Sequence, residues 1–348
     1  MTVGLVYDPL YLEHDTGAHV ENAQRLVAIM TLLEESGLLA RLASIPARDA
    51  TSEELTLVHA AEYVEQVRRV ADSGGAWVDP DTYISPRSYQ AAVRAAGGCL
   101  AAADAVMEGR VESAFCLVRP PGHHALESQA MGFCLFNNVA IAARYLQRRW
   151  DLRRLAIVDF DIHHGNGTYD TFHDDSDILY ASTHAYPFYP GTGHWRETGT
   201  GPGLGRTLSI PMPTASGDAE YALVFREVVA PAVSRFAPEA ILVSAGFDGH
   251  FADPLAPMAL SVDGFGQLMA QVKEMAAGLC QGRLLATLEG GYDLTALAWS
   301  VRRCLEVLMG EPPTPDPLGA PPSPVRPQVE DLVEVLRSLH RLDGPEAS

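Results

Sequence analysis

The stretch LAIVDFDIHHGNGT at residues 155–168 concentrates side chains that bind metal ions and transfer protons. A short apolar run, residues 155–158, is followed by Asp159, Asp161, His163 and Asn166. Alternate residues of a strand point the same way, so Asp159, Asp161 and His163 would share one face if the strand continued. Carboxylates and an imidazole gathered there can hold a metal ion or move protons. A solvated loop is the alternative, which the density of polar residues disfavours.

Three other apolar runs end in similar polar motifs. PPGHH follows one run at residues 120–124, GFD follows another at 246–248, and EGGY follows a third at 289–292. Each motif taken alone is weak evidence for a functional site. In a parallel sheet, however, the carboxyl ends of all strands lie at one edge, which is where open α/β sheets bind ligands. We therefore expect His123, His124, Asp248 and Tyr292 to gather beside the 159–166 segment.

Predicted strands alternate with predicted helices along most of the chain. The strands are expected at 3–7, 114–118, 155–158, 178–184, 207–210, 240–245 and 284–289. The main helices are expected at 22–35, 62–70, 88–107, 219–234, 262–280 and 295–309. This alternation predicts an α/β protein with a mostly parallel sheet covered on both faces. Gly97 and Gly98 inside the 88–107 helix indicate close packing against a neighbour, and residues 74–86 are expected to form a loop.

One catalytic domain is expected over residues 1–310. A Pro-rich connector and a short amphipathic helix at about 329–342 make up residues 311–348.

Composition limits the partners and the compartment. The chain has 348 residues, 47% hydrophobic and 20% charged, with a formal net charge of −19. Such a surface repels nucleic acids and anionic membranes and could attract cationic substrates; the alternative is that the charge serves solubility alone. The five cysteines form no CxxC pair, which is typical of reduced thiols in a cytoplasmic protein. No secretion signal and no apolar run long enough to span a bilayer is expected.

The chemistry that the strand-end residues could perform is that of a hydrolytic metal site. Catalytic zinc keeps three protein ligands and one open position, and Asp161, His163 and Asp248 could supply the three. Two carboxylates and one imidazole form a harder set than usual for zinc, so iron(II) or cobalt(II) is the alternative. The metal would lower the pKa of a bound water and polarise a carbonyl.

The remaining residues could handle protons around such a metal. His123 and His124 follow a different strand and suit a base that passes a proton to a leaving amine. Asp159 and Asn166 are the available acceptors for their outer nitrogens. Tyr292 could donate to an oxyanion. A solvated histidine loop and a packed tyrosine are the ordinary structural alternatives.

Together these motifs resemble the histone deacetylase family, in particular its class II branch and the bacterial relatives of that branch. PPGHH, DFDIHHGNGT, STH…YPGTG at 182–193, SAGFD and LEGGYD occur in the family's order. The resemblance runs from about residue 2 to residue 310. It implies an arginase-like three-layer α/β sandwich and hydrolysis of an N-acyl amide on lysine or a related amine.

The resemblance also implies a role for individual residues. Zinc would be held by Asp161, His163 and Asp248. His124 would act as general base and acid, with His123 as its electrostatic partner. Asp159 would support His123 and Asn166 would support His124, and Tyr292 would polarise the carbonyl. The residues implied in substrate binding are Asp81, Gly132, Phe133, Tyr189, Leu255 and Gly290. Potassium is expected at the main-chain oxygens of Asp159, Asp161 and His163 and the hydroxyl of Ser182.

The sequence departs from the family pattern at a few positions. Tyr189 stands where the tunnel wall is often phenylalanine, and the loop from His19 to Arg25 keeps only part of a His-Pro-Glu pattern. Leu255 falls where the polyamine-specific branch carries glutamate. Leucine offers no charge to a distant ammonium, so acyl-lysine or an apolar acyl amide is favoured over acetylpolyamines.

Three other functions compete with lysine deacetylation. An acetylpolyamine deacetylase has the same fold. An arginase-type ureohydrolase would need a second metal, for which the SAGFDGHFADP segment has too few carboxylates. A catalytically silent binder of acetylated ligands would be expected to lack Tyr292 or a histidine, and this chain has both. A homo-oligomer is left open.

Overall fold

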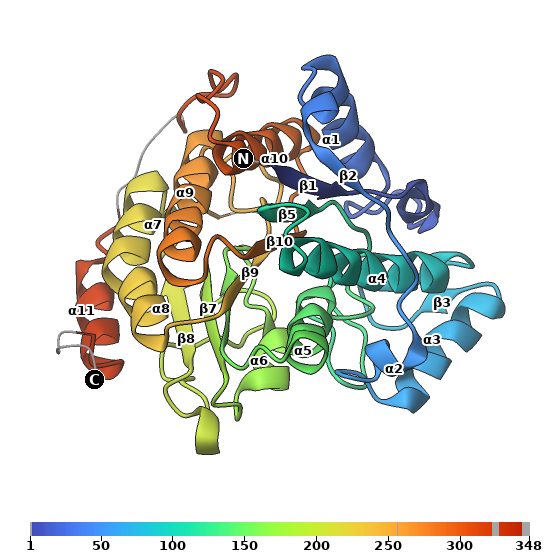
Figure 1. Cartoon of the computed structure of the whole chain (residues 1–348), viewed down its shortest axis with the longest axis horizontal. Helices are drawn as coiled ribbons and strands as arrows, with labels where there is room; N and C mark the ends of the chain where they lie inside the picture. Colours follow the sequence, from blue (N-terminus) through green and yellow to red (C-terminus); the bar gives the residue numbers. More distant parts are fainter. Residues whose placement is uncertain (1, 256, 322–326, 343–348) are drawn as a thin grey trace.

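Eight parallel strands form one sheet between two layers of helices (Figure 1). This computed structural model describes residues 2–255, 257–321 and 327–342. The strand order is β2-β1-β5-β10-β9-β6-β7-β8, and every pairing in the sheet is parallel. The strands are β1 (Val3–Val6), β2 (Ala43–Ile45), β5 (Ser113–Cys116), β6 (Leu155–Asp159), β7 (Ile178–Ala185), β8 (Thr207–Met212), β9 (Ala240–Ala245) and β10 (Leu284–Leu288). The predicted three-layer sandwich is confirmed.

The central strands are short and buried along their whole length. Every residue of β5, β6, β7, β9 and β10 is buried. Strands covered on both faces read as continuous apolar runs rather than alternating ones, which is why their positions could be predicted from the sequence.

Two helical layers cover the sheet. The helices α1 (Gln24–Glu35), α10 (Leu294–Met309), α9 (Val262–Leu279), α7 (Asp218–Val224) and α8 (Ala230–Phe236) pack side by side on one face. The other face carries α4 (Ser88–Met107), α5 (Asn138–Trp150) and α6 (Asn166–Phe172), with α2 (Ser52–Leu55) and α3 (Ala61–Asp72) packed against them. Short 3₁₀ turns span Pro9–Glu13, Leu39–Arg41 and Gly201–Gly203.

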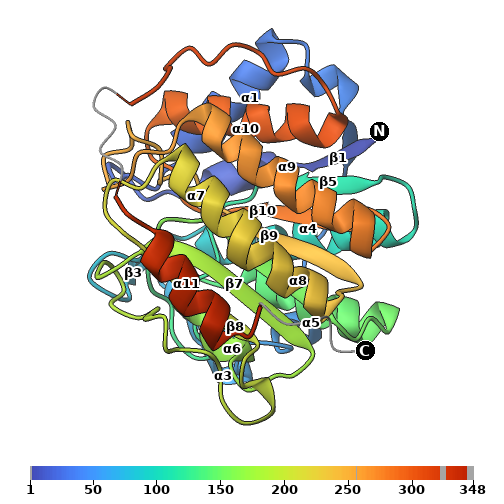
Figure 2. The same ribbon diagram turned by 90° about the vertical axis from the view of Figure 1, so that its left-hand side faces the viewer.

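The helix predicted at 219–234 is interrupted by a π turn, Phe225–Val229, between α7 and α8. Pro231 at the start of α8 explains the interruption, because proline has no N–H to donate and its ring displaces the carbonyl one turn back. The amphipathic helix α11 (Glu330–Leu339) packs on this π turn, outside α7 and α8 (Figure 2). Val333 and Leu336 face inward, and Arg337 pairs with Glu227 at 2.6 Å.

Two short pairings were not predicted. The edge strand β2 has three residues, and the expected loop at 74–86 contains a hairpin of β3 (Ala76–Trp77) and β4 (Tyr83–Ile84). Strands of two or three residues are too short to show periodicity. Of the predicted connector and C-terminal segment, residues 322–326 and 343–348 lie outside the described residues, and the domain boundary at 310 stays a prediction.

All five cysteines are buried and unpaired. Among the described residues, no helix combines the length and the apolar character needed to cross a bilayer.

The predicted close approach at Gly97 is present. A Cβ added there would lie 2.1 Å from the backbone oxygen of Arg48 and 2.5 Å from the backbone nitrogen of Ala50. Neither backbone atom can rotate away, so the segment before α2 rests directly on the backbone of α4.

We expect Gly97→Ala to lower the free energy of unfolding by about 1–3 kcal/mol, since overpacking a fixed contact costs that much. Gly278→Ala in α9 is the matched control, because nothing lies within 4 Å of an added Cβ there. The free energy of unfolding of the control should rise by up to about 1 kcal/mol, because alanine has a higher helix propensity than glycine. Urea unfolding of both variants measures the difference; equal effects would contradict the contact.

Candidate active site

The four strands that end in polar motifs are neighbours in the middle of the sheet. Their order is β5-β10-β9-β6, so PPGHH, EGGY, GFD and the 159–166 segment all leave the sheet at one edge. The convergence predicted from the sequence is therefore present, between strands up to 170 residues apart in the chain.

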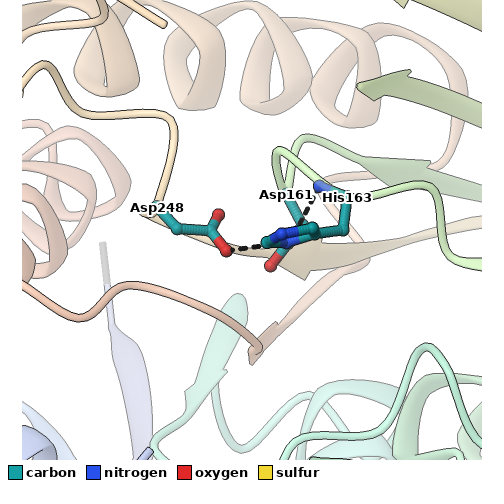
Figure 3. A group of neighbouring side chains, drawn as sticks. All are labelled: Asp161, His163 and Asp248. Carbon is teal, nitrogen blue, oxygen red and sulfur yellow. Dashed lines mark hydrogen bonds and ion pairs between the residues drawn. The ribbon is translucent and has the colours of Figure 1, made fainter. Parts of the chain in front are cut away.

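Asp161, His163 and Asp248 form a buried cluster at this edge (Figure 3). Nδ1 of His163 lies 3.1 Å from Asp161 Oδ1 and 3.1 Å from Asp248 Oδ2. Backbone N–H groups hold the carboxylates: Gly290 donates to Asp161 Oδ2 at 2.8 Å, and Ile162 donates to Asp248 Oδ1 at 3.1 Å. One ligand atom from each of the three residues lies within 4.8 Å of the others, so the cluster could hold a metal ion.

Two further observations fit a cation at this cluster. Asp248 Oδ2 is buried and, apart from its contact with His163, has no hydrogen-bond partner. Glycines line the carboxylates closely: a Cβ on Gly246 would lie 2.0 Å from Asp161 Oδ2, and one on Gly290 would lie 2.2 Å from Asp248 Oδ2. Buried carboxylates this close repel one another unless a positive charge lies between them.

His123 and His124 lie beside this cluster with ring centroids 4.1 Å apart. Nδ1 of His123 is 3.1 Å from Asp159 Oδ2, and Nδ1 of His124 is 2.7 Å from Asn166 Oδ1. Both pairings are those that the sequence resemblance implies. Their catalytic roles remain predictions.

The surroundings separate the pKa values of the two histidines. Burial lowers the pKa of His123, but the carboxylates of Asp161 and Asp159 outweigh it and raise this pKa to about 10. Burial and the neighbouring His123 and His163 hold the pKa of His124 well below its usual value. These surroundings therefore favour the neutral imidazole at His124 and the protonated form at His123. Two titratable groups driven apart in this way are typical of an acid–base pair.

Burial, and then the charge of Asp248, raise the pKa of Tyr292 well above its usual value, so its hydroxyl stays protonated and can donate. Asp253 holds the backbone of this residue, accepting from the N–H of Tyr292 at 2.6 Å and of Asp293 at 3.1 Å. The other oxygen of Asp253 accepts from Leu255 at 3.0 Å. One buried carboxylate thus joins the loop after β9 to the loop after β10.

Arg25 braces the same loop from α1. Its guanidinium is fully buried, donates to the carbonyls of Glu289 and Gly291, and lies over the Tyr292 ring, 5.1 Å from the centroid. Glu21 balances its charge at 3.1 Å and also pairs with the buried Arg119.

A cavity of about 240 Å³ opens from this cluster to the surface. Tyr292 and the histidines 123, 124 and 163 line it. The six residues implied in substrate binding also line it: Asp81, Gly132, Phe133, Tyr189, Leu255 and Gly290. Phe188, which was not predicted, lines it as well and stacks on His163, with centroids 5.4 Å apart.

The backbone fixes Phe133 in the cavity wall. Its φ of 69° lies in the left-handed region that bulky residues avoid. Its N–H donates to Thr82 Oγ1 at 3.1 Å, and that hydroxyl donates to Asp81 Oδ1 at 3.2 Å. The wall and the acidic residue at the mouth are therefore held by one threonine.

The residues implied in potassium binding also lie together. Asp159 and Ser182 are direct partners in the register of β6 and β7. The Ser182 hydroxyl lies 2.9 Å from His184 Nδ1.

Several residues that shape the site were not singled out from the sequence. Glu289 is fully buried, accepts from the N–H groups of Gly122 and His123 at 2.7 and 3.2 Å, and receives the Ser244 hydroxyl at 3.1 Å. Its place at the head of the EGGY motif was the available signal. Arg25 and Asp253 had no comparable signal, since their partners are distant in sequence.

Comparison with known proteins agrees with this geometry. Residues 19–308 match the family model described as the histone deacetylase domain. The chain belongs to the histone deacetylase family. It is accordingly a hydrolase of linear amide bonds, and hydrolysis of acetyl amides is the activity of its family.

Relatives of this deacetylase come from plants and an archaeon. Histone deacetylase 10, chloroplastic, of Oryza sativa subsp. japonica is 38% identical, covering 94% of this chain and 79% of that protein. A probable deacetylase of Archaeoglobus fulgidus is 41% identical over 84% of this chain and 82% of that protein. The solved structure of the HDA15 HD domain superposes with a TM-score of 0.87 at 35% identity, covering 97% and 94% of the two chains. The predicted arginase/deacetylase fold is thus confirmed.

We expect Asp253→Ala to lower the kcat of this deacetylase about 10- to 100-fold, because a displacement near 1 Å of a reacting group can cost that much. Asp253→Asn is the matched variant: it keeps one acceptor oxygen for the Tyr292 and Asp293 N–H groups and should lose less. Steady-state kinetics on an acetyl-lysine amide, with metal content measured in parallel, tests this. Equal losses in both variants, or loss of metal, would contradict positioning of Tyr292.

Proposed function

We propose that this deacetylase removes the acetyl group from acetyl-lysine with a zinc ion held by Asp161, His163 and Asp248. The observation that carries the proposal is the buried Asp/His/Asp cluster beside a pair of buried histidines, both of which line the same cavity as His163. Iron(II) and cobalt(II) are the alternatives for a site with two carboxylates. A divalent ion would polarise the scissile carbonyl and lower the pKa of a water molecule.

His124 is the residue that moves the proton in this mechanism. Its Nδ1 faces the Asn166 carbonyl oxygen and so carries the hydrogen, which leaves Nε2 free to accept a proton. The low pKa of His124 keeps that nitrogen unprotonated before the reaction. The proton then passes from Nε2 to the leaving lysine amine. His123, positively charged and paired with Asp159, stabilises the negative charge that develops on the substrate.

The remaining residues bind and orient the substrate. The Tyr292 hydroxyl donates to the carbonyl oxygen as it becomes an oxyanion. Phe133 and Tyr189 enclose the lysine stem, and Asp81 accepts from the substrate backbone at the mouth. Potassium at the main-chain oxygens near Asp159 and at Ser182 would brace the metal loop.

Leu255 favours acyl-lysine over acetylated polyamines. It lines the cavity with an apolar side chain and presents no carboxylate to a distant ammonium. Turnover of acetyl-lysine peptides should therefore exceed turnover of acetylated spermidine, and the reverse order would contradict this preference. A cytoplasmic location remains part of the proposal.

Chelation tests the metal. Activity on a fluorogenic acetyl-lysine amide should be lost after dialysis against a chelator and return with zinc, iron(II) or cobalt(II), which also ranks the metals. Activity that survives full removal of metal would contradict the mechanism.

Tyr292→Phe tests the oxyanion donor. Removing one such donor should lower kcat by about 100-fold or more, while metal content stays at the wild-type level because no ligand is changed. An unchanged kcat would exclude this residue from the reaction.

The pH dependence of KM tests Asp81. Burial and the neighbouring Asp79 raise the pKa of Asp81 to about 6. Above pH 6 the carboxylate is ionised and accepts strongly, so KM should rise as the pH falls through 6. Asp79→Asn removes the negative charge that helps to raise the pKa of Asp81, so it should move the midpoint of the change in KM to lower pH. A midpoint that does not move would show that Asp81 is not the titrating group.

A further inference from the structure

An exposed tryptophan stands close to the cavity mouth. Trp77 in β3 is 57% exposed, and only Leu204 exceeds it among the large hydrophobic residues of the described chain. It belongs to a row of rings that leads to the cavity wall. The Trp77 centroid lies 6.4 Å from that of His19, and His19 lies edge-on to Phe133 at 4.6 Å.

The hairpin that carries Trp77 gives it a neighbour on the adjacent strand. Trp77 is the register partner of Tyr83 in β4, with ring centroids 5.2 Å apart. The backbone N–H of Val78 donates to the carbonyl of Thr82 at 2.9 Å and closes the turn. Since Thr82 also holds Phe133, the tryptophan and the cavity wall are fixed relative to each other.

The same turn carries two carboxylates, Asp79 and Asp81, joined by a hydrogen bond from the Asp81 N–H to Asp79 Oδ1 at 2.7 Å. Asp81 lines the cavity. An aromatic face beside two acids attracts a cation, through the ring quadrupole and through charge. The net charge of −19 on the chain also attracts cations at long range.

We propose that Trp77 and Asp79 form a subsite for a positively charged side chain flanking the acetyl-lysine of a peptide substrate. The subsite deepens the proposed function and rests on it. A single exposed aromatic ring is ordinary on a protein surface. Here, however, the ring packs on Tyr83, lies two residues before Asp79 in the same hairpin, and is connected by ring contacts to the wall that would enclose the substrate.

Peptides that differ only beside the acetyl-lysine test the subsite. We expect kcat/KM to be highest for a peptide with Arg on both sides of the acetyl-lysine, lower with Leu at those positions, and lowest with Glu. Trp77→Ala should lower the ratio of Arg-flanked to Leu-flanked kcat/KM two- to fivefold, the size of an exposed cation–π contact. Trp77→Phe should keep most of the ratio, whereas Trp77→Leu, apolar but without a π face, should not. Asp79→Asn should lower the ratio at low salt.

Leu204→Ala is the matched control, because Leu204 is also a large exposed hydrophobic residue but precedes the edge strand β8 and does not line the cavity. This variant should change neither the ratio of Arg-flanked to Leu-flanked kcat/KM nor the kcat on either peptide. Circular dichroism and thermal melting establish that each variant is folded.

The possible outcomes separate the subsite from the function. No hydrolysis of a minimal acetyl-lysine amide by the wild-type enzyme would contradict the proposed function itself. Hydrolysis without a flanking preference, or a ratio that Trp77→Leu preserves, would overturn only the cationic subsite. A larger effect of Trp77→Ala on acetylated spermidine than on the Arg-flanked peptide would assign the subsite to a polyamine and overturn the peptide assignment.

Discussion

The repulsion between two buried carboxylates is the constraint on which this site depends. Asp161 and Asp248 follow strands β6 and β9, which are adjacent in the sheet, and their side chains approach a common point. Burial without a compensating charge is costly for both. The compensation within the chain is the imidazoles of His123 and His163 and a few backbone N–H groups, and the glycines at 246 and 290 let those groups come close. A cation would complete this balance.

A second balanced cluster lies on the other side of the EGGY loop. Glu21 sits between two fully buried guanidiniums, and Arg25 holds the loop carbonyls. Removing one partner of such a cluster leaves an unpaired buried charge. The loop with Tyr292 is therefore held from one side by this cluster and from the other by Asp253.

The sheet and the main helices could be predicted because buried parallel strands and amphipathic helices leave strong local patterns. The helix at 88–107 has the predicted bounds, and the Gly97 contact follows from its sequence. The strand β2 and the hairpin of β3 and β4 have only two or three residues per strand and depend on their tertiary neighbours, while the π turn before Pro231 falls inside an otherwise regular helical pattern. The residues of the site fall into the same two groups, those predictable from local sequence and those defined by distant contacts. Residues inside motifs, such as His124 and Asn166, could be named from the sequence. Arg25, Thr82 and Trp77 could not, because contacts across 50 residues or more define what they do.

The left-handed backbone at Phe133 has a consequence for the acyl groups that can enter. Gly132 and Phe133 both have positive φ, and the Phe133 N–H donates to Thr82, so the main chain that carries this ring is held in one place. The position of the main chain is therefore one determinant of how wide the cavity is beside Phe133. Under the proposed function, a smaller residue at position 133 would widen the cavity for a broader acyl-lysine substrate without any change in the main chain.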